Sequence, residues 1–327
     1  MLNRSGARRV LPAVAWFAPC GPFLGRHLGP IVVTGAALVG VADAPRSIAA
    51  AALAQPAAEA ALPDVSALVA QVRQGLKPDS ELLRQYTFHE RRQDVKVSKL
   101  GRVYLGPWRE FEVYPSDVPG ETYKRLVRVD GKPLPAAELD QRDAAHRQGV
   151  LDRLAQIERE TPAARARRQA RRARDLREEQ EVIDDVFAVY DIRVIGRETV
   201  EGRPTLVTSL VPRPSVRTRS DAGKYLKKMR GRAWVNEADT QVVRVEMEAI
   251  EDLTFGLGLV GRMHKGSTVM FRRALVNHEI WLPAEARIKA TGRAVIFRRF
   301  ALETTTYFSD YRKFNITTTE DVTPVGR

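Results

Sequence analysis

The residues at positions 256–261 have the spacing of a dinucleotide-binding loop, with glycines at 256, 258 and 261. That chemistry requires a strand ending at the first glycine and a helix beginning at the last, so that helix amides meet a pyrophosphate. The residues that follow, 262–273, read instead as a turn and then a strand. We therefore predict a glycine-rich bend and no nucleotide cofactor.

Other residue types that support catalysis are scattered along the chain. The histidines are His27, His89, His146, His264 and His278, and no two have the spacing of a helical zinc motif. No GxSxG motif is present, and Ser220 followed by Asp221 is typical of a helix N-cap. The sequence thus predicts no catalytic residue, no metal and no cofactor, and we expect a protein that is not an enzyme.

A run of arginines between positions 165 and 177 is the strongest local charge feature. Acidic residues close the same predicted helix, so one interpretation is a solvated helix held by its own ion pairs. The other is contact with an anionic membrane surface or partner through Arg165, Arg168 and Arg172. Contact with nucleic acid is not expected, because the N-terminal pattern described below predicts export and an exported protein rarely meets nucleic acid.

Large apolar side chains are spread over the predicted strands, where most would form an ordinary core. A strongly curved sheet can also leave an apolar interior for a ligand. The residues that we predict to line such a cavity are Phe111, Trp234, Phe255, Leu257, Met263 and Met270.

The chain has 327 residues and a net charge of +13, of which its first 54 residues carry five arginines against one aspartate. The remaining charge of about +9 favours contact with anionic surfaces. The single cysteine, Cys20, lies in this N-terminal segment, so the rest of the chain has no disulfide and no thiolate site.

The N-terminus has the pattern of an export signal. A basic start precedes the apolar run at 31–42, and Ala52 and Ala54 supply small residues before a cleavage site. We predict a signal peptide at 1–54, cleaved after Ala54, and a periplasmic or secreted protein. A retained membrane anchor and a translation start further downstream stay open as alternatives.

After a linker at 55–63, residues 64–327 are predicted to form a single domain. A helix begins at Asp64, and three turn-separated strands follow at 86–97, 102–114 and 122–129. A charged helical insertion covers 135–186, and strands then return to the end of the chain, interrupted by a short helix at 221–229. Because no crossover helices alternate with the strands, we predict an antiparallel sheet of about nine to eleven strands.

Three segments of the chain resemble a known family. They are 231–248 (GRAWVNEADTQVVRVEME), 281–293 (WLPAEARIKATGR) and 304–314 (TTTYFSDYRKF). The first resembles a strand-turn-strand, and the second and third each a strand, of the outer-membrane lipoprotein-sorting (LolA/LolB-like) superfamily. The resemblance implies an α+β fold, in which a strongly curved antiparallel sheet forms an incomplete β-barrel with helices across its open face.

These observations together favour an extracytoplasmic binding or carrier protein. The expected ligand is apolar or amphiphilic, such as an acyl chain or a lipoprotein-like acylated molecule. The alternative is an envelope interaction or sensor module that uses the same fold to grip a protein partner.

Overall fold

The computed structural model describes residues 62–98, 102–115, 118, 122–255, 261–294 and 298–314. The predicted signal peptide at 1–54, almost all of the linker at 55–63 and the glycine-rich bend after Phe255 lie outside these ranges.

Two short helices and a meander of strands open the domain. They are α2 (Val65–Gly75), α3 (Asp79–Leu82) with a 3-10 turn (Leu83–Gln85), β1 (Tyr86–Val97), β2 (Val103–Pro115), β3 (Thr122–Val129) and β4 (Lys132–Pro133). Asp64 caps α2 by accepting a hydrogen bond from the amide of Ala67. Asp130 and Gly131 both have positive φ, as a tight hairpin turn requires.

The predicted helical insertion consists of two long helices. α4 covers Ala136–Glu158 and α5 covers Pro162–Val189. The side chain of Thr161 caps α5 and Pro162 occupies its first turn, which explains the sharp break between the two helices. No residue of α4 is buried, and the buried residues of α5 all lie at or beyond Val182. The arginine-rich half of α5 is therefore held only weakly by packing.

The second strand group completes the sheet. Its elements are β5 (Tyr190–Val200), β6 (Arg203–Pro212), α6 (Gly223–Leu226), β7 (Met229–Asn236), β8 (Val242–Ala249), β9 (Leu253–Phe255), β10 (Gly261–Met263), β11 (Thr268–Val276), β12 (Ile280–Ala294) and β13 (Arg298–Lys313).

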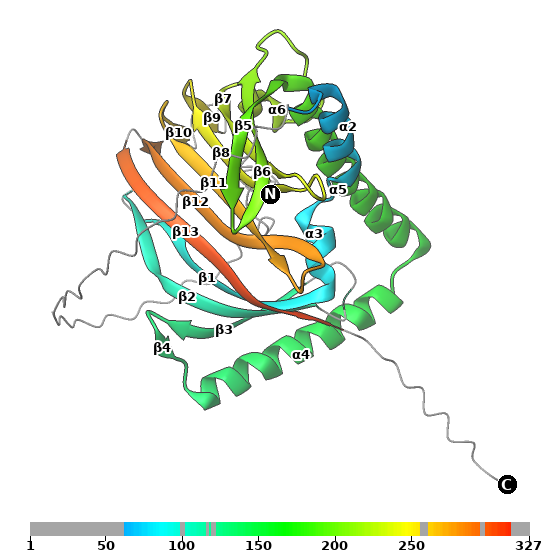
Figure 1. Cartoon of the computed structure of the whole chain (residues 1–327). Helices are drawn as coiled ribbons and strands as arrows, with labels where there is room; N and C mark the ends of the chain where they lie inside the picture. Colours follow the sequence, from blue (N-terminus) through cyan, green and yellow to red (C-terminus); the bar gives the residue numbers. More distant parts are fainter. Residues whose placement is uncertain are drawn as a thin grey trace.

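All described strands belong to one antiparallel sheet of 13 strands. The main order is β4-β3-β2-β1-β13-β12-β11-β8-β7-β6-β5, so the last strand lies beside the first. The sheet curls strongly but does not close, as Figure 1 shows. The predicted fold class is confirmed. The predicted nine to eleven strands were too few, because β4, β9 and β10 have two or three residues and are too short to show alternation.

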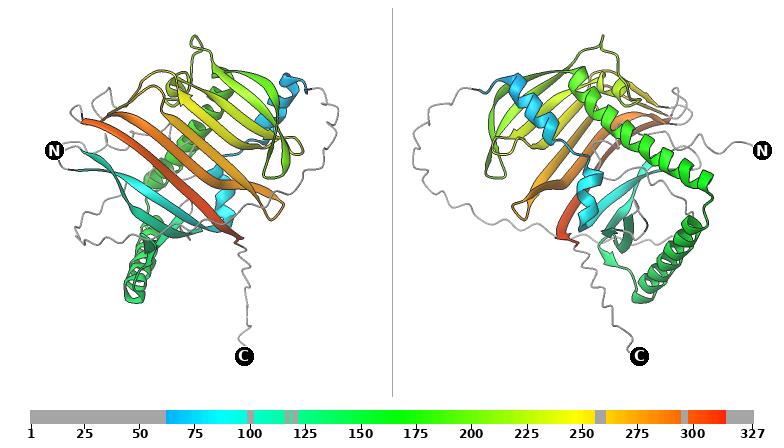
Figure 2. Two further views of the ribbon diagram at one scale, coloured as in Figure 1. Left: turned by 60° about the vertical axis from the view of Figure 1, so that its left-hand side comes forward. Right: turned by 90° about the vertical axis from the view of Figure 1, so that its right-hand side faces the viewer.

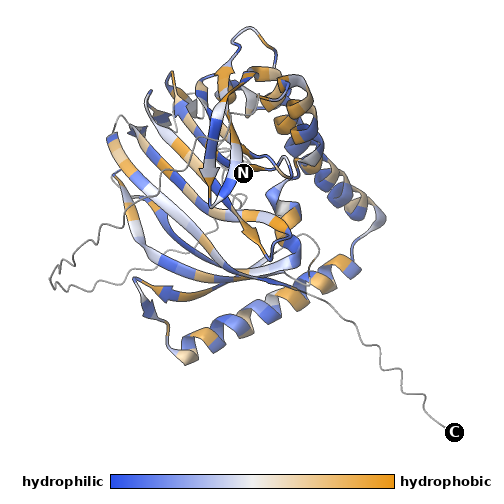
Figure 3. Ribbon diagram, in the orientation of Figure 1, coloured by the Kyte–Doolittle hydropathy of each residue, from blue (hydrophilic) through white to orange (hydrophobic). Residues whose placement is uncertain are grey.

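The concave face of the curl holds most of the core. Helices α2, α3 and α5 lie on this side of the sheet (Figure 2). One cluster includes Leu226, Met247 and Val269, and another includes Phe88 and Leu282. Hydrophilic and hydrophobic residues alternate along the strands (Figure 3), as expected where one face is buried and the other meets water.

The outer, convex face is closed mainly by cross-strand ion pairs. Arg232 and Arg244 both pair with Glu246, and their guanidinium groups lie 4.9 and 4.7 Å from the ring centre of Trp234. The Trp234 indole N–H donates to Glu198 at 2.8 Å. This tryptophan is 1% exposed, so the arginines and its neighbours shield it from water completely.

A buried ion pair anchors α3 to the sheet. Arg273 of β11 lies 2.6 Å from Asp79, with side-chain exposures of 7% and 11%. Burial raises the pKa of Asp79, an effect that the charge and hydrogen bond of Arg273 oppose. The two residues are 194 positions apart in the chain, so the pair ties the N-terminal helices to the second strand group.

A polar contact holds α4 on the outer side of β3. Asp143 accepts hydrogen bonds from the Tyr123 hydroxyl at 2.5 Å and from Nε of Arg125, and His146 stacks on the Tyr123 ring with centroids 3.6 Å apart. The hydrogen bonds from Tyr123 and then Arg125 hold the pKa of Asp143 below its usual value. We call Asp143, Tyr123, Arg125 and His146 the α4 latch.

We expect Arg273→Met to destabilise the protein by about 3 kcal/mol, because it leaves the Asp79 carboxylate buried without its cation. Urea unfolding would measure the change. Adding Asp79→Leu should recover most of the loss, since the unpaired charge is removed. The matched control is Lys313→Met, which breaks an exposed ion pair with Glu279 and should cost less than about 1 kcal/mol. Equal losses in both single variants would contradict the role given to burial.

We expect the α4 latch to open at low pH. Because the folded pKa of Asp143 is lowered, its stabilisation is present above the ordinary carboxyl pKa of about 4 and is lost as the pH falls through the folded value. Hydrogen exchange of α4, corrected for intrinsic rates, should show this loss of protection. Asp143→Asn should give the loosened helix already at neutral pH, whereas the exposed Asp140→Asn should not. If the α4 amides of Asp143→Asn are as well protected from exchange as those of the native protein, the α4 latch is not what holds the helix.

Candidate functional site

Several apolar side chains on the concave face are only partly buried, and three of them lie together on β12 and β13. Ile288 of β12 and Phe300 and Leu302 of β13 border the core cluster that contains Met247. The register places Ala290 opposite Leu302 and Gly292 opposite Phe300, so these residues share one face. We call Ile288, Phe300 and Leu302 the apolar strip.

The β12 residues beside the apolar strip have small side chains that project little from the sheet. Ala286 and Ala290 are 8% and 4% exposed, and Gly292 continues the same face. A Cβ atom at Gly292 would lie 2.2 Å from the backbone oxygen of Arg262 and 2.7 Å from the ring of Phe300. Glycine is therefore required for the close approach of β10, and larger residues would displace the Phe300 ring.

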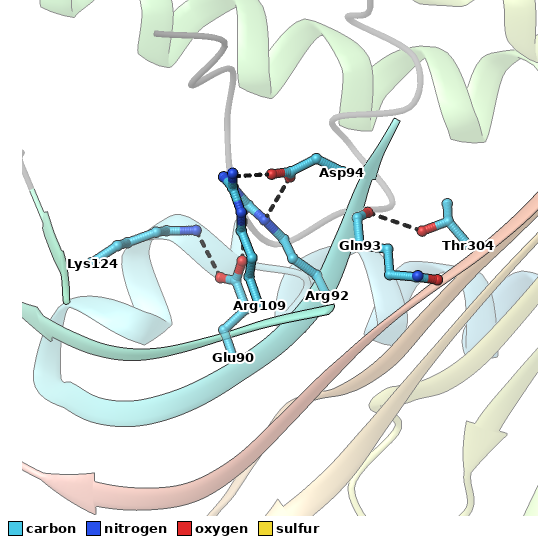
Figure 4. A network of polar contacts seen from close by, with 7 residues as sticks. All are labelled: Glu90, Arg92, Gln93, Asp94, Arg109, Lys124 and Thr304. Carbon is cyan, nitrogen blue, oxygen red and sulfur yellow. Dashed lines mark hydrogen bonds and ion pairs between the residues drawn. The ribbon is translucent and has the colours of Figure 1, made fainter. Parts of the chain in front are cut away.

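A charged cluster lies on the same face at the β1–β3 end of the sheet. Glu90 lies 2.7 Å from Lys124 and 2.7 Å from Arg92, and Asp94 lies 3.1 Å from Arg92 and 3.2 Å from Arg109. Figure 4 shows these side chains gathered above the strands. We call Glu90, Arg92, Asp94, Arg109 and Lys124 the inner charged cluster.

The register connects the inner charged cluster to the apolar strip. Glu90 stands opposite both Phe111 and Phe308, which are core residues of the concave side. Arg92 stands opposite Thr306, and the neighbouring Thr304 stands opposite Ile288. One continuous face therefore changes from apolar on β12 and β13 to charged on β1 and β2.

The inner charged cluster has three cations and two carboxylates. Glu90 is 1% exposed, whereas Arg109 is 34% exposed. The buried Nε of Arg92 lies near Asp94 but makes no aligned hydrogen bond within the described residues. A polar or anionic group placed beside Arg92 and Arg109 would meet a net positive charge.

The six residues predicted to line one cavity do not share a face. Phe111 and Met263 lie in clusters of the concave side. Trp234 comes directly after Ala233, and Met270 comes directly before Phe271; both Ala233 and Phe271 belong to the concave core. Since side chains alternate along a strand, Trp234 and Met270 lie on the convex face. Leu257 lies outside the described residues, as does the side chain of Phe255.

The arginines predicted to meet an anionic surface lie on the half of α5 that has no buried residue. Arg165 and Arg172 are exposed, and Arg168 is partly covered by an ion pair with Glu160 at 2.9 Å. Their contact with an anionic surface stays a prediction.

Two of the cavities formed by the described residues have volumes of about 340 and 300 Å³. The first is bounded by Val211, Arg230 and Lys265, and the second by Arg73, Asp184 and Arg217. Neither includes the apolar strip. In the described part of the chain, His, Cys, Asp and Glu residues form no group of three that would hold a metal, and no helix is long and apolar enough to span a bilayer.

Sequence reasoning missed both the apolar strip and the inner charged cluster. Residues 280–313 alternate as strands do, which identifies two faces but does not say which of them is concave. The charges at positions 90–94 look like those of any solvent-facing strand. Only the pairing of β1 with β13 reveals that they point inward.

No family model matches the chain, and no curated protein matches it. Several solved structures resemble it. A DUF1329 family protein from Desulfovibrio piger has 13% identity and a TM-score of 0.28, covering 76% of this chain and 92% of that chain. A LolA superfamily protein from Nitrosomonas europaea has 8% identity and a TM-score of 0.25, covering 76% and 93%.

A third similar structure is the MucA/MucB complex of Pseudomonas aeruginosa, with 10% identity and a TM-score of 0.21, covering 77% of this chain and 100% of the matched chain. The superfamily that the sequence segments resemble thus recurs among the structural matches. At these identities and TM-scores, the function must be argued from the residues of this chain.

Proposed function

We propose that this protein binds an amphiphilic ligand outside the cytoplasm. The apolar part of the ligand would lie along the apolar strip, and its polar head would meet the inner charged cluster. One observation carries the proposal: Ile288, Phe300 and Leu302 are partly exposed on the concave face, on the same side of the sheet as a charged cluster built around the buried Glu90. An acyl chain is the ligand whose chemistry changes along its length in the same way.

The energetics favour a chain over a compact ligand. Each CH₂ group removed from water contributes about 0.8 kcal/mol, so several groups along the strip would give useful affinity. The polar head would contribute mainly orientation, because Glu90 and Asp94 already neutralise two of the three cations. Helix α5 crosses the same side of the sheet (Figure 2), so a bound ligand would lie beneath it.

An extended apolar segment of a protein partner is the second candidate. The partial exposure of Ile288, Phe300 and Leu302 supports it, because an extended segment could contact all three side chains. In the MucA/MucB structure, MucB is in complex with another protein, MucA. Lipid co-purifying with this chain would separate the two candidates.

We expect a fluorescent long-chain fatty acid to bind the protein and to be displaced by lipid extracted from it. Leu302→Asn together with Ile288→Asn should weaken binding at least about tenfold, because two amides would replace the apolar contact. Fluorescence titration would measure the dissociation constant. The control is Ile195→Asn, at an exposed position of β5.

Unchanged fatty acid binding by the double variant would exclude the strip as the site. Absence of fatty acid binding by the native protein, with capture of an apolar peptide instead, would favour the protein-partner alternative. Circular dichroism and the urea midpoint would show that each variant is folded.

We also infer that the chain is exported, from the basic start, the apolar run at 31–42 and the small residues before Gln55. N-terminal sequencing of protein from the envelope fraction should begin at or near Gln55. Lys substituted for Ala52 and Ala54 should leave a larger, uncleaved form, because the peptidase requires small side chains there. Recovery of the uncut chain from the cytosol would contradict export.

A further inference from the structure

Three arginines lie directly opposite one another on neighbouring strands. Arg262 of β10 is paired with Arg293 of β12, which is paired with Arg299 of β13. All three side chains are exposed. Their neighbours Met263 and Phe300 belong to the concave core cluster, so alternation puts the arginines on the convex face. We call Arg262, Arg293 and Arg299 the arginine row.

Like charges directly opposite in a sheet are destabilising. At other places on the convex face an arginine stands opposite an acid, as Arg230 does opposite Glu248. Where Arg244 stands opposite Arg272, each arginine has an acidic partner, Glu246 and Glu201. In the arginine row only Arg262 has an acidic neighbour, Asp252 at 3.7 Å. Within the described part of the chain, Arg293 and Arg299 form no ion pair. The arginine row therefore concentrates positive charge at positions where it does not stabilise the fold.

The shape of the row indicates what it would bind. Neighbouring strands are about 4.8 Å apart, so the three side chains span about 10 Å across an open sheet surface. The exposed Lys265, whose amide donates to Asp252, lies in the adjoining turn. An open row of this width suits a surface that carries many anionic groups better than a single enclosed phosphate.

We propose that the arginine row docks the protein on an anionic phospholipid surface. The contact is independent of the ligand proposed for the concave face, because the two sites lie on opposite faces of the sheet. It is electrostatic and therefore weakens as salt rises.

The arginine-rich half of α5 is the competing candidate for membrane contact. In Figure 1 the ends of β12 and β13 that carry the row lie on the side of the molecule away from the α4–α5 junction. A single planar bilayer would therefore meet one or the other. Arg168 and Arg174 of α5 are paired with Glu160 and Glu178, and Asp175, Glu179 and Glu181 lie on the same helix, so carboxylates are interspersed with its arginines. Among the described residues, the carboxylate within ion-pair distance of the arginine row is Asp252, beside Arg262. This difference favours the row.

Vesicle co-sedimentation would test the proposal with the mature chain. Vesicles of phosphatidylcholine with phosphatidylglycerol should bind the native protein at low salt and release it at high salt, and pure phosphatidylcholine vesicles should not bind it. Arg293→Gln with Arg299→Gln should weaken binding about 25-fold, at about fivefold per arginine. The matched control, Arg193→Gln with Arg128→Gln, removes the same charge at exposed positions elsewhere and should change binding less than about twofold.

Two further measurements make the result decisive. The urea midpoint of the row variant should equal or exceed that of the native protein, because removing like-charge repulsion does not destabilise the sheet. Inorganic phosphate should compete poorly with vesicles at equal ionic strength. The proposal is overturned if the row variant binds like the native protein, if the control variant loses as much, or if Arg165→Gln with Arg172→Gln abolishes binding while the row variant keeps it.

Discussion

A single sheet of 13 strands has two faces, and the helices of this chain cover mainly one of them. Helices α2 and α6, the 3-10 turn after α3 and the end of α5 all contribute buried residues to the concave side. The convex face has only α4, which touches it at β3. The curl of the sheet follows from this imbalance, because bending inward brings the apolar face together and leaves the polar face to water.

The convex face is stabilised by ion pairs between neighbouring strands rather than by helices packed on it. Arginine and glutamate alternate across neighbouring strands, and Trp234 is buried beneath two guanidinium groups. Each exposed pair contributes little by itself. Together these ion pairs cover the apolar atoms of a large surface. This explains why so many charged residues occur in the strands. Against this background the unpaired arginine row stands out as a departure that the fold does not require.

The concave face carries charged residues at its β1–β3 end. There the helices leave part of the face uncovered, and Glu90, Arg92 and Lys124 occupy positions that a closed core would give to apolar residues. A buried carboxylate is tolerated because two cations contact it. The result is a face that is apolar at one end and charged at the other.

The sequence by itself determined the elements and their order. Turn residues such as Asp130 and Gly131, the caps at Asp64 and Thr161, and the alternation of the long strands depend on neighbours close in the chain. These local signals also identify the helical insertion between two strand groups. The α4 latch, by contrast, joins β3 to α4 through side chains whose proximity no local pattern reveals.

Only the tertiary structure decided which face of each strand points inward. A period of two divides a strand into two faces but does not rank them when both carry large side chains, so Trp234 was grouped with Phe111 although they lie on opposite sides. The inner charged cluster, the Asp79–Arg273 pair and the arginine row likewise exist only once β1 pairs with β13 and β10 folds onto β12. Those pairings join residues far apart in the chain, and their register depends on how the whole sheet curls.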